Sequence, residues 1–101
     1  MTTANKAKFR LGQTVATPAA LEALQEAGQT ALPFLQRHQS GDWGDVCPED
    51  KQSNDEAVAH EGDHDQQQRV LSAYRTAKDV KIWIITEWDR SVTTILLPED
   101  Y

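Results

Sequence analysis

The last third of the chain constrains the fold most strongly, because it contains two runs of β-branched and aromatic residues. Residues 80–86 read VKIWIIT and residues 92–97 read VTTILL, and strands prefer both compositions. A third apolar run occupies residues 69–76, and short polar segments separate the three runs. Three strands with short connections predict an antiparallel β-meander over residues 69–97.

The central run also indicates how such a sheet would be covered. Strand alternation places Lys81, Trp83 and Ile85 on one face, and Ile82 and Ile84 on the other. Both faces therefore carry apolar side chains, so we expect each to be at least partly covered. Helices are expected to pack on one of them.

Two helices are predicted before the strands. Thr17 and Pro18 form a typical helix start, since threonine caps a helix and proline is tolerated in its first turn. Apolar residues at helical spacing then predict a helical hairpin over residues 18–39. A proline followed by two acidic residues favours a third, more polar helix over residues 46–60.

The chain of 101 residues is expected to form a single α+β domain, with N-terminal helices on a three- to four-stranded antiparallel sheet. Residues 1–7 are predicted to be a frayed tail and residues 61–68 a loop, while residues 8–16 suit an edge strand or an extended arm. Among the tryptophans, Trp43 and Trp88 are candidates for exposed contacts and Trp83 for burial. The expected core consists of Leu21, Leu24, Leu32, Leu35, Leu71, Ile82, Ile84, Ile95 and Leu97.

Charge is distributed unevenly along the chain, whose net charge is −6. Residues 1–40 are mildly basic and residues 69–101 are balanced. Residues 41–68 hold a single base, Lys51, against nine acids: Asp42, Asp45, Glu49, Asp50, Asp55, Glu56, Glu61, Asp63 and Asp65. Such a segment is either a solvated face or a docking surface for a basic protein. The overall acidity argues against direct DNA binding, which needs a positive surface.

Several functional classes are not expected. No apolar run approaches the length of a membrane span, and we predict neither a membrane partner nor a secretory signal, which favours a cytoplasmic protein. The one cysteine, Cys47, cannot form an internal disulfide and excludes a four-cysteine zinc site. It could be a reactive thiol at a helix start or a small buried residue. No cofactor is predicted.

The block from His38 to Asp45 is the part of the sequence most typical of a site. His38 could act as a base or ligand that Asp42 orients, with Trp43 as a pocket wall. Alternatively, His38 stabilises the end of a helix while Trp43 fills the core, and this structural interpretation is preferred. The candidate binding residues are Asp42, Trp43, Asp45, Glu49, Asp50 and Trp88.

A weaker signal for a metal site lies in the segment from His60 to Asp65. His60 and His64 stand four residues apart, a spacing that can bind a divalent metal on a helix. Gly62 interrupts that helix, so we predict a solvated loop and no metal site.

Three stretches carry a resemblance to known proteins: residues 9–18 (FRLGQTVATP), 37–45 (RHQSGDWGD) and 82–98 (IWIITEWDRSVTTILLP), with Tyr101 at the end. Together they resemble a family of bacterial proteins of about this length that plasmids and integrative elements encode. Members are often labelled plasmid-related protein or type I restriction endonuclease subunit M. The resemblance implies a mobile-element origin and no particular activity. A methyltransferase is not expected, because a glycine-rich cofactor loop and an Asn-Pro-Pro-Tyr-like motif are absent.

We therefore expect a non-enzymatic accessory protein that acts by protein–protein contact through residues 41–68. The alternative is a barnase-like RNA-cleaving toxin that uses one face of the meander, to which the chain bears a faint likeness. Arg90 then stands where that family has a histidine general acid, and a guanidinium cannot readily donate a proton. The catalytic candidates in that case are His38, Asp42, Arg69 and Arg90, with Asp55 or Glu56 as the base.

Overall fold

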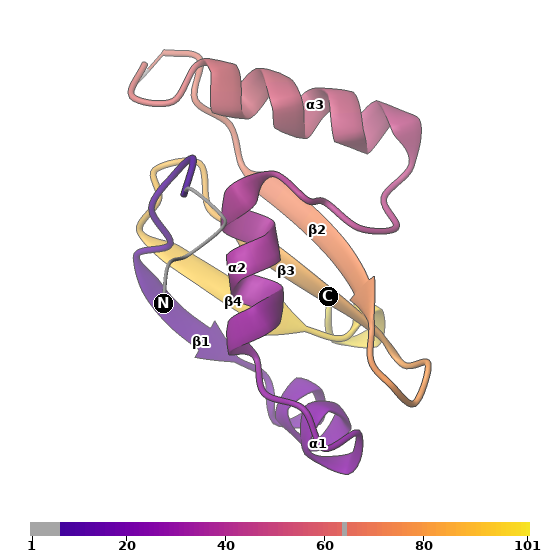
Figure 1. Ribbon diagram of the computed structural model, residues 1–101. Coiled ribbons are helices and arrows are strands. Elements are labelled where there is room, and N and C mark those ends of the chain that lie inside the picture. Colours follow the sequence, from indigo (N-terminus) through magenta and orange to yellow (C-terminus); the bar gives the residue numbers. More distant parts are fainter. Residues whose placement is uncertain (1–6, 64) are drawn as a thin grey trace, which may run out of the picture.

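The computed structural model describes residues 7–63 and 65–101 (Figure 1). The elements, in chain order, are β1 (Gln13–Ala16), α1 (Pro18–Glu26), α2 (Leu32–Ser40), α3 (Pro48–Ala59), β2 (Val70–Arg75), β3 (Lys81–Thr86), β4 (Val92–Leu96) and a final 3-10 turn, η1 (Pro98–Asp100). The predicted α+β class is confirmed. Within the described ranges, none of the helices has the length and apolar character needed to cross a membrane.

The four strands form one mixed sheet in the order β1-β4-β3-β2. Strands β2, β3 and β4 form an antiparallel meander, whereas β1 runs parallel to β4. The prediction of a purely antiparallel sheet is therefore wrong, because the edge strand expected within residues 8–16 pairs parallel to β4. The helices are not all N-terminal either, since β1 precedes them. Gly12 makes this pairing possible: it has a φ of 66°, and a Cβ there would lie 2.4 Å from the Arg90 carbonyl oxygen.

Local sequence signals explain where the helices begin and end. Thr17 caps α1 by accepting a backbone hydrogen bond, and Pro18 occupies the first helical position. Gly41 ends α2 in the left-handed conformation, with a φ of 92°. Pro48 begins α3, whose first turn holds two acidic residues that the helix dipole favours.

The main core lies between the sheet and the helices α1 and α2. Figure 1 shows α2 lying across this face of the sheet, which we call the inner face. Its buried residues come from both layers: Ala20, Leu24, Phe34, Tyr74, Ile82, Ile84 and Ile95. Phe34 contacts Tyr74 with a centroid distance of 5.6 Å, which ties α2 to β2.

The predicted core is right for Leu24 and for the three isoleucines, which are buried. Leu35 and Leu97 pack at the margin of the same cluster, and Leu71 is half-buried on the opposite face. The prediction is wrong for Leu21 and Leu32, whose side chains are 53% and 61% exposed. In both helices the sheet-facing positions are held by other residues: Ala20, Ala23 and Leu24 in α1, and Phe34 and His38 in α2.

A second, smaller core lies beneath α3 and contains Phe9, Trp43, Ala57 and Val70. Trp43 is only 4% exposed, so the expectation that it offers an exposed contact is wrong. Its indole N–H donates to the Asp55 carboxylate at 2.9 Å, which satisfies its one polar atom and fixes α3 in place. Trp83, in contrast, is half-buried on the sheet face opposite the inner face, which we call the open face.

The outer edge of β2 is closed by polar contacts from two segments. The Asn54 side-chain amide of α3 donates to the Leu71 carbonyl at 2.6 Å and accepts from the Leu71 N–H at 3.1 Å. The Ala73 N–H donates to the backbone carbonyl of residue 43, and the Ala73 carbonyl accepts from the backbone N–H of residue 45. Gly44 stands between those residues, and a Cβ there would lie 2.0 Å from the Ala73 carbonyl oxygen. The edge of β2 is thus unavailable for strand addition.

Candidate functional site

His38 lies at the point where α2 meets β2 and β3, and its ring is completely buried. Its Nδ1 is 2.5 Å from the Ser72 hydroxyl, and its Nε2 is 2.9 Å from the Thr86 hydroxyl. The Phe9 ring packs edge-on against the imidazole at a centroid distance of 5.1 Å. The residue thus joins three elements from inside the protein.

The hydrogen-bond chain beyond His38 fixes which ring nitrogen carries the proton. Thr93 donates its one hydroxyl proton to the Leu11 carbonyl at 2.7 Å, so it must accept from Thr86, 2.7 Å away. Because Thr86 uses its own proton there, the His38 Nε2–H donates to Thr86. Nδ1 of the neutral ring then accepts from Ser72. Each side-chain polar atom of this hydrogen-bonded series, from Ser72 to Thr93, thus has a partner within the protein.

Burial, together with the nearby positive charge of Arg90, lowers the pKa of His38 to about 3. The ring is therefore neutral at physiological pH. A general base must reach the proton that it abstracts. Both nitrogens of His38 are instead bonded to Ser72 and Thr86, so the geometry favours a structural role. That role is to join α2 to the strands as a neutral ring, and not to stabilise the helix end by a positive charge, as the sequence suggested.

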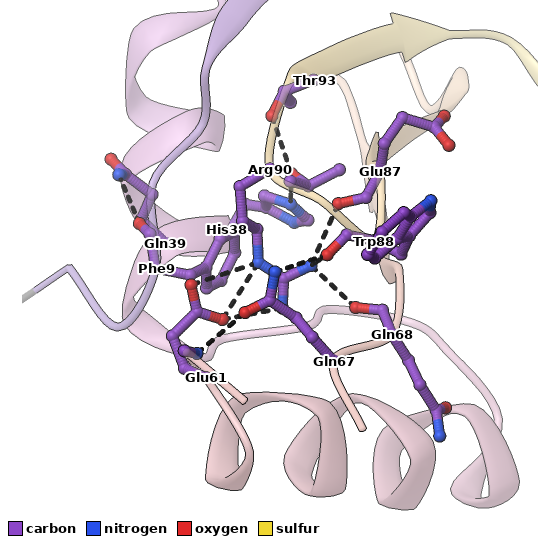
Figure 2. A network of polar contacts seen from close by, with 12 residues as sticks. Phe9, His38, Gln39, Glu61, Gln67, Gln68, Glu87, Trp88, Arg90 and Thr93 are labelled. Carbon is purple, nitrogen blue, oxygen red and sulfur yellow. Dashed lines mark hydrogen bonds and ion pairs between the residues drawn. The ribbon is translucent and has the colours of Figure 1, made fainter. Parts of the chain in front are cut away.

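Arg90 is also buried, in the turn between β3 and β4, where its φ of 61° is left-handed. Figure 2 shows its guanidinium held by groups from several segments. Nη2 donates to the Glu61 carboxylate at 2.8 Å, and Nε donates to the same carboxylate. Nη1 donates to backbone carbonyls of Gln68 and of residues 87 and 88. Arg90 thus fastens the end of α3 and the following loop to the β3–β4 turn.

The other two catalytic candidates lie elsewhere. Asp42 is exposed, and its ion pair with Arg37 at 2.7 Å holds the pKa of the carboxyl below its usual value. Arg69 is exposed and donates to the Tyr101 hydroxyl at 2.8 Å. The structure brings His38 and Arg90 to the same neighbourhood but does not bring Asp42 or Arg69 to them.

The predicted metal candidates lie near the end of α3. His60 is exposed at the C-cap of α3, and His64 falls outside the described residues. Among the residues that are described, no group of three or more histidine, cysteine or carboxylate side chains could hold a metal ion.

The acidic segment forms an exposed surface on and around α3. Of its nine acids, Glu61 is drawn inward by Arg90, and the other eight are exposed. We call these eight the acidic surface: Asp42, Asp45, Glu49, Asp50, Asp55, Glu56, Asp63 and Asp65. α3 turns Asn54, Ala57 and Val58 toward the rest of the protein, and the exposed Asp55 carboxylate reaches the Trp43 indole N–H. The helix therefore presents Glu49, Asp50 and Glu56 to solvent from a fixed position.

Of the remaining binding candidates, Trp88 is 49% exposed in the β3–β4 turn. Its backbone carbonyl accepts from the Gln67 side chain at 2.6 Å. Trp88 follows the end of β3, whereas Asp50 in the first turn of α3 lies beside Lys81 at the start of β3, so Trp88 and this turn are at opposite ends of that strand.

The open face of the sheet contains two hollows that the sequence did not predict. The first has a volume of about 250 Å³ and lies between the first turn of α3 and the strands β2 and β3. The second, of about 300 Å³, lies beside Arg69 and Tyr101. The apolar side chains on both faces of β3 were the available signal, but they did not indicate which face stays open.

Comparison with protein-family models, with curated proteins and with solved structures found no match to this chain.

Proposed function

We propose that this protein is a non-enzymatic accessory protein that binds a basic protein partner through the acidic surface. The observation that carries the proposal is the exposure of eight carboxylates on and around one helix, with Lys51 as the single lysine or arginine of residues 41–68. Such a surface attracts a positively charged partner and steers its approach. From the sequence resemblance alone, we further propose that a bacterial mobile element encodes the protein. From the apolar patterning of the sequence, we propose that it acts in the cytoplasm.

The fixed position of α3 supports a binding role. Asn54 bonds the helix to β2, and Asp55 bonds it to Trp43. A surface that is already ordered loses little conformational entropy when a partner binds. The acids are thus better placed for a specific contact than they would be on a mobile loop.

The ribonuclease alternative has less support. Each guanidinium nitrogen of Arg90 donates to Glu61 or to backbone carbonyls, so the group is not presented to a phosphate. His38 is enclosed and neutral. RNA would also have to approach a chain with a net charge of −6.

Affinity capture from a bacterial lysate tests the proposal. The bait variant carries Glu49→Gln, Asp50→Asn and Glu56→Gln, and a matched control carries Glu22→Gln, Glu26→Gln and Glu99→Gln, so both lose three exposed charges. A basic protein should be retained by the wild type and the control in about 0.1 M salt, and released in about 1 M salt, where screening is nearly complete. The α3 variant should fail to retain it. Equal capture by both variants would contradict the proposal.

A further inference from the structure

The first hollow combines an apolar floor with a short side chain at its centre. Leu71 and Ala73 of β2 and Trp83 of β3 form the floor, and Val46 and Cys47 form the wall beside α3. Ala73 is paired across the strands with Trp83, and its single methyl group leaves the floor recessed beside the larger ring. The hollow is therefore shaped to receive one apolar side chain.

The same hollow has an acidic side. Asp45 and Asp50 line it next to α3, and Lys81 lines it on the far side. Asp45 forms an ion pair with Arg75, whose Nε lies 3.5 Å from the carboxylate, while Asp50 makes no ion pair within the described part of the chain. Glu49 stands next to Asp50 in the first turn of α3 and adds to the negative potential. Lys81 and the Arg75 partner of Asp45 bring positive charge to the same rim, so a cationic group would be attracted to the side where Glu49 and Asp50 stand.

We propose that this hollow seats an aliphatic side chain of the basic partner, while a lysine or arginine of the same partner segment reaches Asp45 and Asp50. The inference rests on the proposed function and names the place where the partner is anchored. Apolar burial supplies the affinity, and the acids select a basic segment.

The structure argues against other ways of occupying this place. A strand cannot be added to β2, because Asn54 and the backbone of residues 43 and 45 already bond its edge. A second copy of the chain would bring its own acidic surface, and single-stranded RNA would bring phosphates, to Asp45 and Asp50. A basic protein segment that docks by its side chains has the complementary charge.

Titration with synthetic peptides, followed by amide chemical shifts in NMR, tests the inference. The probe is acetyl-Gly-Leu-Lys-Lys-Gly-amide, and the controls replace its leucine by alanine or its lysines by glutamate. The leucine peptide should shift the amides of Val46, Ala73 and Trp83 and slow the alkylation of Cys47. The alanine peptide should bind about tenfold more weakly, as expected for the loss of one buried aliphatic side chain.

Two variants separate the hollow from the charge. Ala73→Met fills the floor and should abolish the preference for leucine over alanine while leaving weak, salt-sensitive binding of both peptides. Binding of the leucine peptide should be weakened more by the double substitution Asp45→Asn with Asp50→Asn than by the matched double substitution Asp63→Asn with Asp65→Asn. Equal affinity of the leucine and alanine peptides, shifts spread over the whole surface, or stronger binding of an oligouridine at this face would each overturn the inference.

The two proposals fail in different ways. If Ala73→Met has no effect while the α3 variant loses its captured partner, the partner binds the acidic surface without using the hollow. If the α3 variant captures the partner as well as the control does, the proposed function itself is wrong.

Discussion

One histidine determines how this protein should respond to acid. His38 is neutral because burial, together with the nearby charge of Arg90, lowers its pKa. The Thr93 proton is directed at the Leu11 carbonyl, which sets the order of the donors back to Ser72 and so places the one ring proton on Nε2. A protonated ring would place a second N–H against Ser72 next to the buried Arg90. Burial and the positive charge of Arg90 therefore disfavour the charged form of His38 in the folded state.

The pKa of His38 falls from 6.5 in the unfolded chain to about 3 in the folded protein. Because the folded pKa is lowered, the unfolded chain takes up a proton at His38 that the folded protein does not. The free energy of unfolding is therefore at its full value above pH 6.5 and decreases as the pH falls toward 3. Moving from pH 7 to about pH 4.5 should reduce the free energy of unfolding by about 2 to 3 kcal/mol. Urea denaturation across this range measures the loss. His38→Gln should remove most of the pH dependence and His60→Gln should not; equal slopes in both variants would contradict the assignment.

Arg90 is the second residue whose role can be measured by itself. Arg90→Met should lower the free energy of unfolding by about 3 kcal/mol, since it leaves the Glu61 carboxylate and several carbonyls without their donor. The control, Arg75→Met, removes an exposed guanidinium and should cost at most about 0.5 kcal/mol. Chemical denaturation of both variants checks the difference. Similar stability of the two would show that the Arg90 contacts do not hold the turn.

At the scale of elements, α3 both presents the acids and protects the sheet. Its Asn54 side chain imitates a neighbouring strand by bonding both backbone groups of Leu71. Because α3 buries few apolar groups, these two hydrogen bonds are a large part of what holds it against β2. The position of the acidic surface therefore depends on this contact.

Replacing Asn54 by alanine should cost about 2 kcal/mol of unfolding free energy, because two hydrogen bonds of about 1 kcal/mol each are lost. It should also speed hydrogen exchange at the Leu71 amide. Ser53→Ala, on the exposed side of the same helix, should leave both quantities unchanged. Slow exchange at Leu71 in the Asn54 variant would mean that another group protects the edge.

The elements that could be predicted were those whose signals are local. The composition of residues 69–97 indicated β2, β3 and β4, and Thr17 with Pro18 indicated the start of α1. The parallel pairing of β1 could not be predicted, because its partner β4 lies far along the chain. Gly12 is required by the close approach to the backbone of residues 90 and 91, but the sequence does not show which segment approaches it. The exposure of Leu21 and Leu32 was missed because periodicity alone did not select the sheet-facing stripe of either helix.

The candidate site was predictable to a similar extent. Charge adds up along the sequence, so residues 41–68 could be identified as an acidic segment without a structure. The chain of hydrogen bonds around His38 could not be, since its members come from residues 11, 38, 72, 86 and 93. The first hollow likewise depends on residues 45–50 meeting residues 71–83.

For the whole molecule, the net charge of −6 is a property of one side. The acids gather on and around α3, which lies above β2 in Figure 1, while residues 69–101, which include the β-meander, are balanced in charge. A basic partner is thus attracted to one side of the protein, and the open face beside that side offers it an apolar anchor. The long-range attraction between the acidic surface and the partner would then act next to the hollow in which the partner's apolar side chain packs.

The most direct test of this account is the affinity of the captured partner as a function of ionic strength. We expect the affinity for the wild type to fall steeply with added salt, and the variant neutralised at Glu22, Glu26 and Glu99 to behave in the same way. The variant neutralised at Glu49 and Asp50 of the first turn of α3, together with Glu56, should bind weakly and with a shallow salt dependence. The same affinity and the same slope in all three proteins would contradict the central claim that α3 is the docking surface.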